Sequence, residues 1–128
     1  KRAYSEAQIK DPRKEISATE VHDCFSITEL VTMEDLDLAN EGEAWKAVLD
    51  GRFDAEGQIP CQIDGGLKCF GHPIGASGLR MLYEMFLQFQ GRAGERQINN
   101  MKYGLTHNLG GHPVQNVSSV AIIGHYDG

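Results

Sequence analysis

The segment of the chain best suited to chemistry surrounds His72. Residues 65–78 read GGLKCFGHPIGASG, so this histidine lies in a tight turn directly before the glycine-rich start of a helix, which we expect to begin near Ile74. Exposed backbone N–H groups and the positive end of the helix dipole then face whatever the imidazole faces. A neutral imidazole in that setting can act as a general base near pH 7. Considered alone, such a histidine is more often structural, with its nitrogens bound to backbone groups.

Two further reactive side chains, His22 and Cys24, lie near the start of the chain. Residues 19–25 alternate with period two, which predicts a strand with His22 and Cys24 on one face and Asp23 on the other. A helix should follow at Ser26, because this serine is followed at capping-box spacing by a glutamate. The thiol of Cys24 would then lie beside a helix N-terminus, where the dipole favours a thiolate. A free cysteine can also be a small buried residue, and Asp23 is expected to anchor hydrogen bonds.

Residues 107–111, with the sequence His-Asn-Leu-Gly-Gly, form a third group. The patterns on either side predict strands over residues 101–106 and 117–123, so the glycine-rich residues between them should form the connecting turn. A second Gly-His-Pro, at residues 111–113, lacks the glycine-rich helix start that follows the first. We therefore interpret His112 as structural or as lining of a substrate pocket.

The remaining elements are expected to be helices and one polar connection. A short helix is predicted over residues 4–10 and closed by Asp11-Pro12, because the residue before a proline is pushed out of the helical region. Helical turns are predicted at residues 43–50, before a polar stretch over residues 51–64. The last helix has apolar residues at helical spacing; these are Leu79, Leu82, Phe86 and Phe89.

The composition is that of one globular domain. Hydrophobic residues make up 41% and charged residues 23% of the 128 positions. The net charge of −6 argues against nucleic acid or an anionic membrane surface as the main partner, and the apolar runs are too short to span a bilayer. Three cysteines without a CxxC pair favour a reducing compartment, for which we expect the cytoplasm. The five histidines lack metal-binding spacing, so no metal site is expected.

Together, the three groups resemble the motifs of the thiolases. Residues 65–78 match the thiolase pattern GG-x-x-x-x-GHP-x-GASG, and residues 21–25 resemble the HDCF variant of the motif that reads NEAF in most thiolases. Residues 107–111 resemble the HN-containing glycine turn that replaces the usual C-x-G, a pairing typical of the sterol-carrier-protein-x type. The resemblance implies an α/β fold over residues 1–128: the thiolase C-terminal domain, part of a five-stranded mixed sheet covered by helices.

The resemblance also implies catalytic roles. In such enzymes the GHP histidine, here His72, activates a cysteine nucleophile that holds the acyl group as a thioester. Cys24 would serve as the second acid/base, which moves the proton at the carbon where the C–C bond breaks or forms. His22 stands in the place of the NEAF asparagine and would help to form an oxyanion hole beside the thioester oxygen.

A second oxyanion hole is implied at the glycine turn, which comprises His107, Asn108, Leu109 and Gly110. Its donor would be a backbone N–H, and because the turn departs from C-x-G, either Leu109 or Gly110 is open as the source. Coenzyme A is implied as a substrate and no tightly bound cofactor is expected. The residues that contact coenzyme A are not assigned from this chain.

The resemblance places the nucleophilic cysteine in an N-terminal half, on the same or a separate chain. Thiolase C-terminal halves begin with two strands that precede the helix at residues 4–10, so the domain is expected to be incomplete, with a bare sheet edge and uncovered apolar helix faces. The expected partners are that N-terminal half, further copies of the chain, an acyl-CoA and a small zinc-ribbon/OB-fold protein.

Three functions are therefore weighed. The first is thiolytic cleavage of a 3-oxoacyl-CoA or the reverse Claisen condensation. A retro-aldol lyase that acts on β-hydroxyacyl-CoA is the closest enzymatic alternative, although the presence of both His72 and Cys24 favours a thiolase. The third is a non-catalytic interaction subunit of a thiolase-like complex. A second chain that carries a nucleophilic cysteine would separate these possibilities.

Overall fold

The chain folds around a small mixed sheet. The computed structural model describes residues 1–112 and 114–125, and within them the sheet consists of β1 (Ile16–Glu20), β2 (Tyr103–His112) and β3 (Gln115–Gly124), in that order. β1 runs parallel to β2, whereas β2 and β3 form an antiparallel hairpin. The expected α/β fold with a mixed sheet is confirmed.

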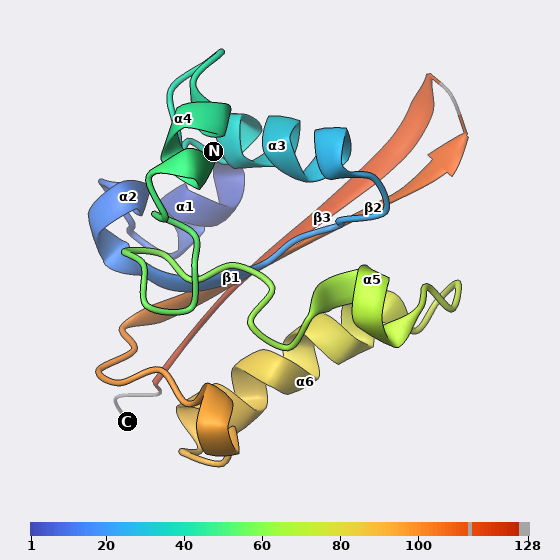
Figure 1. Ribbon diagram of the computed structural model, residues 1–128. Coiled ribbons are helices and arrows are strands. Elements are labelled where there is room, and N and C mark those ends of the chain that lie inside the picture. The colour runs from blue at the N-terminus through green and yellow to red at the C-terminus, as the bar shows by residue number, and fades with distance from the viewer. Residues whose placement is uncertain (113, 126–128) are drawn as a thin grey trace.

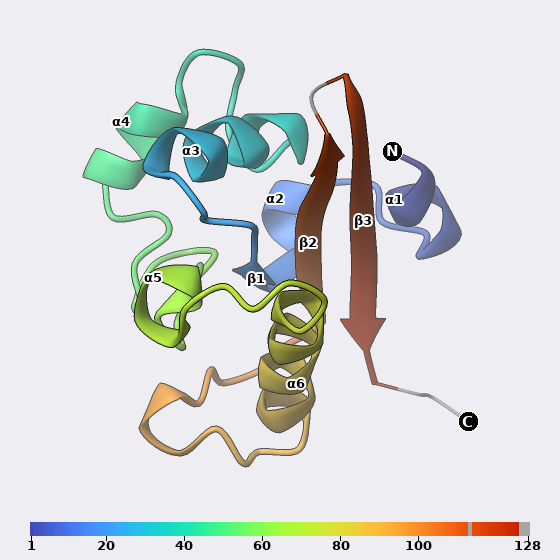
Figure 2. The same cartoon turned by 90° about the vertical axis from the view of Figure 1, so that its right-hand side faces the viewer.

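Helices lie on both faces of this sheet (Figure 1). Four short helices gather on one side, and two pack on the other, where the longest of them follows the hairpin (Figure 2). On the first side are α1 (Arg2–Glu6), α2 (Pro12–Glu15), α3 (Ser26–Asp35) and α4 (Ala44–Leu49); on the second are α5 (Gly66–Phe70) and α6 (Ser77–Phe89), followed by a 3₁₀ turn at Gly94–Arg96. α3, α4 and α6 confirm three of the predicted helices. Within the described ranges no helix combines the length and apolar character that crossing a membrane requires.

The two faces of the sheet have separate hydrophobic clusters. On the side of α3, Leu105 of β2 packs in a large cluster that includes Met33. On the side of α6, Ala18 of β1 packs with Met85. Successive side chains of a strand point to opposite faces, so Gly104, the neighbour of Leu105, lies against Met85 instead. The alternation along β2 therefore decides which residues face each layer of helices.

The segment predicted as a turn, residues 107–111, belongs to a strand. β2 continues through it to His112, and the chain reverses only around Val114. Gly111 marks a close approach of two backbones, because a Cβ at this position would lie 2.5 Å from the carbonyl oxygen of Gln115. The prediction of a turn was wrong because a glycine can lie within a strand where two backbones approach closely, and not only where the chain reverses direction.

β1 ends earlier than the alternating pattern predicts. The strand stops at Glu20, and residues 21–25 continue as a loop into α3. The prediction that His22 and Cys24 share one face of a strand was therefore wrong. The strand ends because the backbone of the next residue hydrogen-bonds to the side-chain amide of Gln62 rather than to a neighbouring strand.

The helix ends near the N-terminus also differ in detail from the predictions. α1 ends at Glu6, and Pro12 opens α2 at its first position, where the missing N–H of proline costs nothing. Ser26 lies inside α3 and makes no capping hydrogen bond. The capping box fails because Glu29 accepts a hydrogen bond from the thiol of Cys61, at 3.7 Å, instead of turning back to the helix start.

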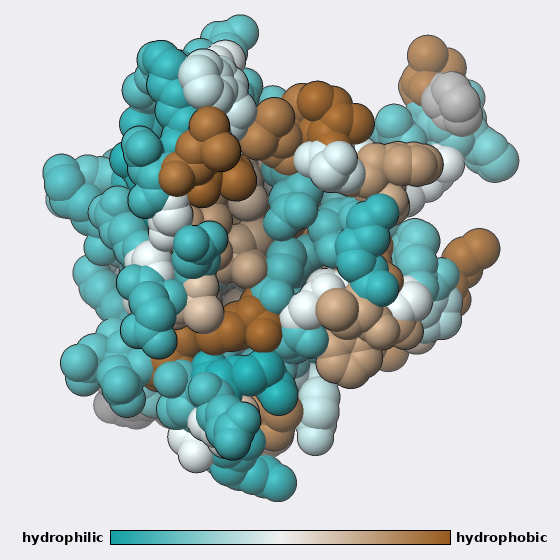
Figure 3. Space-filling view, in the orientation of Figure 1, coloured by the Kyte–Doolittle hydropathy of each residue, from teal (hydrophilic) through white to brown (hydrophobic). Residues whose placement is uncertain are grey.

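α6 is apolar on two faces. The face against the sheet has Met81 and Met85, neither of which is exposed. Of the four residues whose spacing predicts the helix, three point outward: Leu79 is 67%, Leu82 41% and Phe86 49% exposed. The fourth, Phe89, packs toward the sheet. The expected uncovered apolar face of this helix is thus confirmed. Hydrophobic side chains also gather on the surface over α3 and α4 (Figure 3).

The contact between β2 and α6 makes Gly104 sensitive to added volume. A methyl group there would lie 2.5 Å from Sδ of Met85 and 3.3 Å from the ring of Phe89. We expect Gly104→Ala to lower the free energy of unfolding by about 1–3 kcal/mol, the usual cost of overpacking, as measured by urea denaturation. The matched control is Gly110→Ala on the same strand, where a methyl group would meet no atom within 4 Å. Equal stability of the two variants would contradict the tight packing of α6 on β2.

Candidate active site

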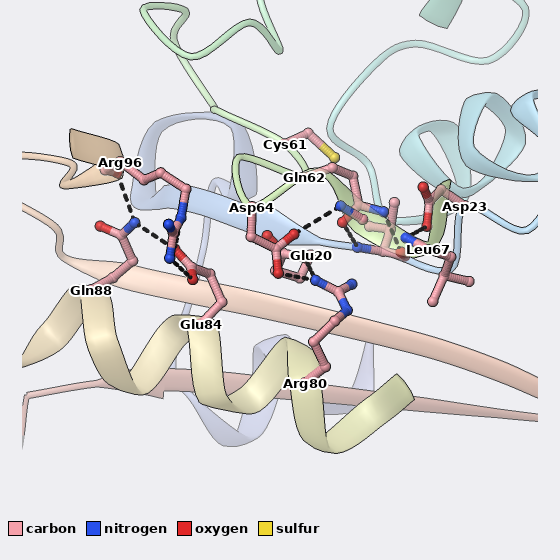
Figure 4. A network of polar contacts seen from close by, with 12 residues as sticks. Glu20, Asp23, Cys61, Gln62, Asp64, Leu67, Arg80, Glu84, Gln88 and Arg96 are labelled. Carbon is pink, nitrogen blue, oxygen red and sulfur yellow. Dashed lines mark hydrogen bonds and ion pairs between the residues drawn. The ribbon is translucent and has the colours of Figure 1, made fainter. Parts of the chain in front are cut away.

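The loop after β1 is held by side chains from two other segments. The amide of Gln62 satisfies both backbone groups of Val21, accepting from its N–H at 3.2 Å and donating to its carbonyl at 2.6 Å (Figure 4). Nδ1 of His22 lies 2.8 Å from Oδ1 of Asn108 on β2. These contacts stand in for strand pairing, so the loop that carries His22 keeps a defined position beyond the end of β1.

Asp23 joins the same loop to the glycine-rich segment before His72. Its Oδ1 accepts the backbone N–H of Leu67, in the first turn of α5, at 2.9 Å. A Cβ on Gly66 would lie 2.4 Å from Oδ2 of Asp23, and Gly65 and Gly66 have φ values of +102° and +62°. The two glycines therefore allow the carboxylate to reach α5, and Asp23 is the hydrogen-bond anchor that we expected.

His72 is exposed in the connection between α5 and α6. Its Nδ1 lies 2.7 Å from Oγ of Ser77, the first residue of α6, and the Ser77 hydroxyl donates to the carbonyl oxygen of Pro73 at 3.3 Å. When the Ser77 hydroxyl donates to Pro73, its oxygen can accept a hydrogen bond from Nδ1 of His72. Neutral His72 then has its lone pair on Nε2, as a general base requires.

His22 and His72 line one cavity of about 600 Å³. The two ring centroids lie 4.8 Å apart, with an angle of 76° between the ring planes. Asn108, Leu109 and Gly110 of β2 line the same cavity. The three motif segments, far apart in the sequence, therefore meet around a single space that contains two imidazoles and one carboxamide.

Two predicted site residues are not among those that line this cavity. Cys24 is half-buried, and its thiol donates to Oγ1 of Thr28 in the first turn of α3, at 3.8 Å. His107 lines a neighbouring hollow of about 360 Å³ that it shares with Leu109. Burial lowers the pKa of His107, and the nearby His22 lowers it further. The structure thus brings His22 and His72 together but holds Cys24 and His107 to the side.

Other candidates have structural surroundings. Burial raises the pKa of the Cys61 thiol, which donates to Glu29, so this cysteine stays protonated near neutral pH. His112, of the second Gly-His-Pro, is exposed at the end of β2 and does not line the cavity of His72, while Pro113 lies outside the described residues.

A buried ion network connects the segments that carry the motifs (Figure 4). Arg80, near the start of α6, pairs through Nη1 with Oε2 of Glu20 at 3.0 Å and also with Oδ2 of Asp64. The side chains of Glu20 and Asp64 are only 0% and 3% exposed. Glu20 precedes the loop of His22, and Asp64 precedes the glycines that lead to His72. One guanidinium therefore joins three segments that position the cavity.

Burial dominates the electrostatics of this network. It raises the pKa of Glu20 to about 8, with a further rise from Asp64 and an opposing effect from Arg80. Oε1 of Glu20 and the Nε and Nη2 atoms of Arg80 have no hydrogen-bond partner among the described residues. One guanidinium faces two carboxyl groups, and Glu20 is mostly protonated at pH 7. The positive charge of Arg80 then pairs with the negative charge of Asp64.

Sequence reasoning missed these supporting residues. The one available signal is that Arg80 interrupts a run of apolar residues in a predicted helix. Its partner Glu20 is 60 positions away, and no local pattern relates the two. Ser77 was visible only as part of a glycine-rich helix start, and Gln62 only as part of a polar stretch.

The polar groups around the cavity suit proton transfer and hydrogen bonding to an uncharged oxygen. The two imidazoles and the amide of Asn108 supply one or more donors and acceptors each. Within residues 1–112 and 114–125, no group of three or more His, Cys, Asp or Glu side chains is placed to hold a metal ion. The chemistry that these residues can perform is acid/base chemistry.

Comparison with known proteins identifies the family. Residues 1–124 match the family model described as thiolase C-terminal domain-like. The chain belongs to this family. The thiolase-type origin that the motifs imply is confirmed.

Two curated relatives illustrate the similarity of this thiolase-type domain. The chain is 44% identical over 97 residues to the acetyl-CoA acetyltransferase of Methanothermobacter thermautotrophicus, an alignment that covers 76% of this chain and 25% of the relative. It is 43% identical over 96 residues to sterol carrier protein 2 of Homo sapiens, covering 75% of this chain and 18% of the relative. The chain thus spans a quarter or less of these relatives.

A solved structure confirms the fold. The chain titled "Ltp2-ChsH2(DUF35) aldolase" matches with a TM-score of 0.75 and 21% sequence identity, over 95% of this chain and 29% of that one. At this level of identity the likeness establishes the thiolase-type fold.

The buried carboxyl group of Glu20 predicts a pH dependence of stability. Its pKa is about 8 in the folded domain against 4.5 for an ordinary glutamate. The contribution of this raised pKa to the free energy of unfolding is therefore complete below about pH 4.5, and it is lost as the pH rises through 8. Glu20→Gln should flatten the dependence of the free energy of unfolding on pH, a change of about a few kcal/mol at most over this range. Urea denaturation between pH 5 and 9 measures it.

The control for this variant is Glu6→Gln, since Glu6 is exposed and its ion pair is with the exposed Arg2. It should keep the slope of the unmodified protein. If Glu20→Gln also keeps that slope, Glu20 is ionised in the folded state and the interpretation of the network is wrong.

Proposed function

We propose that this domain contributes the proton-transferring half of an acyl-CoA acyltransferase, which cleaves a 3-oxoacyl-CoA thiolytically or runs the reverse Claisen condensation. The observation that carries the proposal is the arrangement of His72. Its Nδ1 is engaged by Ser77, and it shares a cavity with His22 and Asn108. Such a base, beside groups able to contact a thioester oxygen, fits acyl transfer through a cysteine.

In the cleavage direction, Nε2 of His72 takes the proton of a cysteine thiol supplied by the nucleophile-bearing half of the enzyme. The thiolate attacks the 3-oxo carbon of the substrate. The bond between C2 and C3 then breaks, its electron pair leaves as the enolate of the departing acyl-CoA, and the acyl group stays on the cysteine as a thioester.

Cys24 completes the proton balance. Its thiol gives a proton to C2 of the enolate, and the resulting thiolate takes the proton of the incoming coenzyme A. Coenzyme A then displaces the acyl group from the nucleophilic cysteine, which recovers its proton from His72.

Stabilisation of the developing oxyanion is assigned to His22 and to β2. His22 is proposed to contact the thioester oxygen, and a backbone N–H of the segment His107, Asn108, Leu109 and Gly110 to contact the second oxyanion. A strand can present such an N–H as well as a turn can. Successive backbone N–H groups of a strand point to alternate sides, so every second N–H of β2 points away from its neighbour β3.

The proposed partners follow from the surface and the chemistry. The uncovered face of α6, with Leu79, Leu82 and Phe86, suits packing against the half that supplies the nucleophile. Coenzyme A would enter as a substrate, with no tightly bound cofactor. Further copies of the chain and a small zinc-ribbon/OB-fold protein are proposed as additional partners. Free cysteines are compatible with a cytoplasmic, reducing setting.

The two alternatives lead to different observations. A retro-aldol lyase would cleave its substrate without consuming coenzyme A and without an acyl-cysteine intermediate. An interaction subunit would bind its partner equally well without the imidazole of His72. Both differ from the thiolase in the first half-reaction, which is therefore the step to measure.

His72→Ala in the assembled enzyme should slow acylation of the nucleophilic cysteine by a factor on the order of a hundred or more, the scale of a lost general base. Binding of acyl-CoA should change little. Rapid-quench measurement of the acyl-enzyme tests this, with His112→Ala as the control that changes the histidine of the other Gly-His-Pro. Acylation at the normal rate in His72→Ala would remove this histidine from the role of base.

Cys24→Ser separates a proton shuttle from a packing residue. The serine hydroxyl is too weak an acid to exchange protons near pH 7, so C–C cleavage should stop while acylation by a simple acyl-CoA continues, because His72 handles that step. Both half-reactions and the thermal stability are measured in one variant. Cys69→Ser, at an exposed cysteine, is the matched control. Equal loss of both half-reactions, or of neither, would exclude Cys24 from the mechanism.

A further inference from the structure

Arg80 is connected to both ends of α5, the short helix that leads to His72. Its Nη1 atom pairs with Asp64, and Oδ1 of Asp64 accepts the backbone N–H of Gly66, the first residue of α5, at 2.8 Å. At the other end, the guanidinium carbon lies 5.5 Å from the ring centroid of Phe70, the last residue of α5. His72 follows Phe70 by two positions, so one guanidinium holds the helix at its start and just before the proposed base.

α5 depends on such outside contacts to keep its place. It has only five residues, and a helix this short is not stable through its own hydrogen bonds. The glycines on either side, Gly65 and Gly71, have φ values of +102° and +79°, a region that glycine enters freely. The backbone does little to restrain α5 at either end, so the side chains that contact this helix determine where His72 lies.

The same guanidinium is connected to the loop of His22 (Figure 4). Its Nη1 atom lies 3.0 Å from Oε2 of Glu20, the last residue of β1, which comes two positions before His22. On α6, Arg80 follows Ser77 by about one turn, and Oγ of Ser77 lies 2.7 Å from Nδ1 of His72. Short routes therefore lead from Arg80 to each of the two imidazoles, whose ring centroids are 4.8 Å apart.

A contribution to stability alone does not account for this arginine. Its side chain is only 15% exposed, and Nε and Nη2 have no hydrogen-bond partner among the described residues. Burying a guanidinium is costly when its donors are unpaired, and well-packed apolar side chains often replace buried ion pairs without loss of stability. An apolar side chain cannot supply a rigid plane that pairs with two carboxyl groups and also lies over an aromatic ring. Arg80 is therefore better suited to fixing geometry than to adding stability.

We propose that Arg80 is a positioning residue for acyl transfer. By holding the end of β1 and both ends of α5 against α6, it sets the separation and the angle between the rings of His22 and His72. The geometric part of this proposal follows from contacts within the domain. The kinetic part rests on the proposed function, because it requires His72 to be the base of the acylation step.

Single-turnover acylation of the assembled enzyme by acetyl-CoA tests the kinetic part. Arg80→Met should lower the rate constant of acylation by roughly tenfold to a hundredfold, the scale of a misplaced catalytic group, while the half-saturating concentration of acetyl-CoA stays nearly constant. Arg80→Lys keeps the charge but lacks the planar group, so it should also lower the rate constant. The amplitude of the same reaction reports the fraction of folded enzyme and separates a loss of stability from a loss of geometry.

Arg96→Met is the matched control. Arg96 also pairs with a buried carboxyl group of α6, that of Glu84, at 2.9 Å, but it lies on the 3₁₀ turn at the opposite end of that helix from His72. Its loss should lower the thermal stability and leave the rate constant unchanged. A normal rate constant in Arg80→Met, with only the amplitude or the thermal stability reduced, would overturn the proposal. If Arg80→Met fails to fold, the rate constant of Arg80→Lys decides in the same way.

A crystal structure of the assembled variant tests the geometric part without catalysis. In Arg80→Met, or in Arg80→Lys if the former does not fold, the rings of His22 and His72 should depart from the 4.8 Å separation and the 76° angle of the unmodified protein. An unchanged pair of rings would overturn the proposal. Absence of an acyl-cysteine in the unmodified enzyme would instead refute the proposed function, and the ring geometry of the variant would still decide the role of Arg80.

Discussion

Arg80 reaches from α6 into the junction between the end of β1 and the start of α5, and the arrangement of the cavity depends on that contact. Its guanidinium pairs with Glu20 and Asp64, whose side chains are almost completely buried. A buried charge that loses its partner costs several kcal/mol, so these segments stay together while the network is intact. The loops that carry His22 and His72 extend from two of the segments it joins.

Glycines determine how closely the segments approach. Gly66 makes room for the carboxylate of Asp23, and Gly78 makes room for the amide of Asn108. A methyl group on Gly66 would overlap the carboxylate of Asp23, and one on Gly78 would press against the amide of Asn108 at 3.0 Å. The glycines that look like part of a catalytic signature therefore act through packing, whereas the chemistry is proposed for His72.

The period of β2 separates two environments around the site. Asn108 faces the cavity that His22 and His72 line, and its neighbour His107 faces a hollow beside α3. A shift of one residue in the pairing of β2 would exchange the two. The long hairpin with β3, paired at ten positions from Tyr103 to His112, holds the register and so preserves the hydrogen bond between Asn108 and His22.

The sequence by itself determined the family, the α/β class, the helices α3, α4 and α6 in outline, and the side chains with reactive groups, because motif identity and helical spacing are local properties. It did not determine where β1 ends or that residues 107–111 pair as a strand, because strand limits depend on what the neighbouring backbone offers. It also left open which groups the two imidazoles contact. Nδ1 of His72 lies 2.7 Å from the hydroxyl of Ser77, and Nδ1 of His22 lies 2.8 Å from the amide oxygen of Asn108. Asn108 is 86 residues from His22, so only the tertiary structure brings these two side chains within hydrogen-bonding distance.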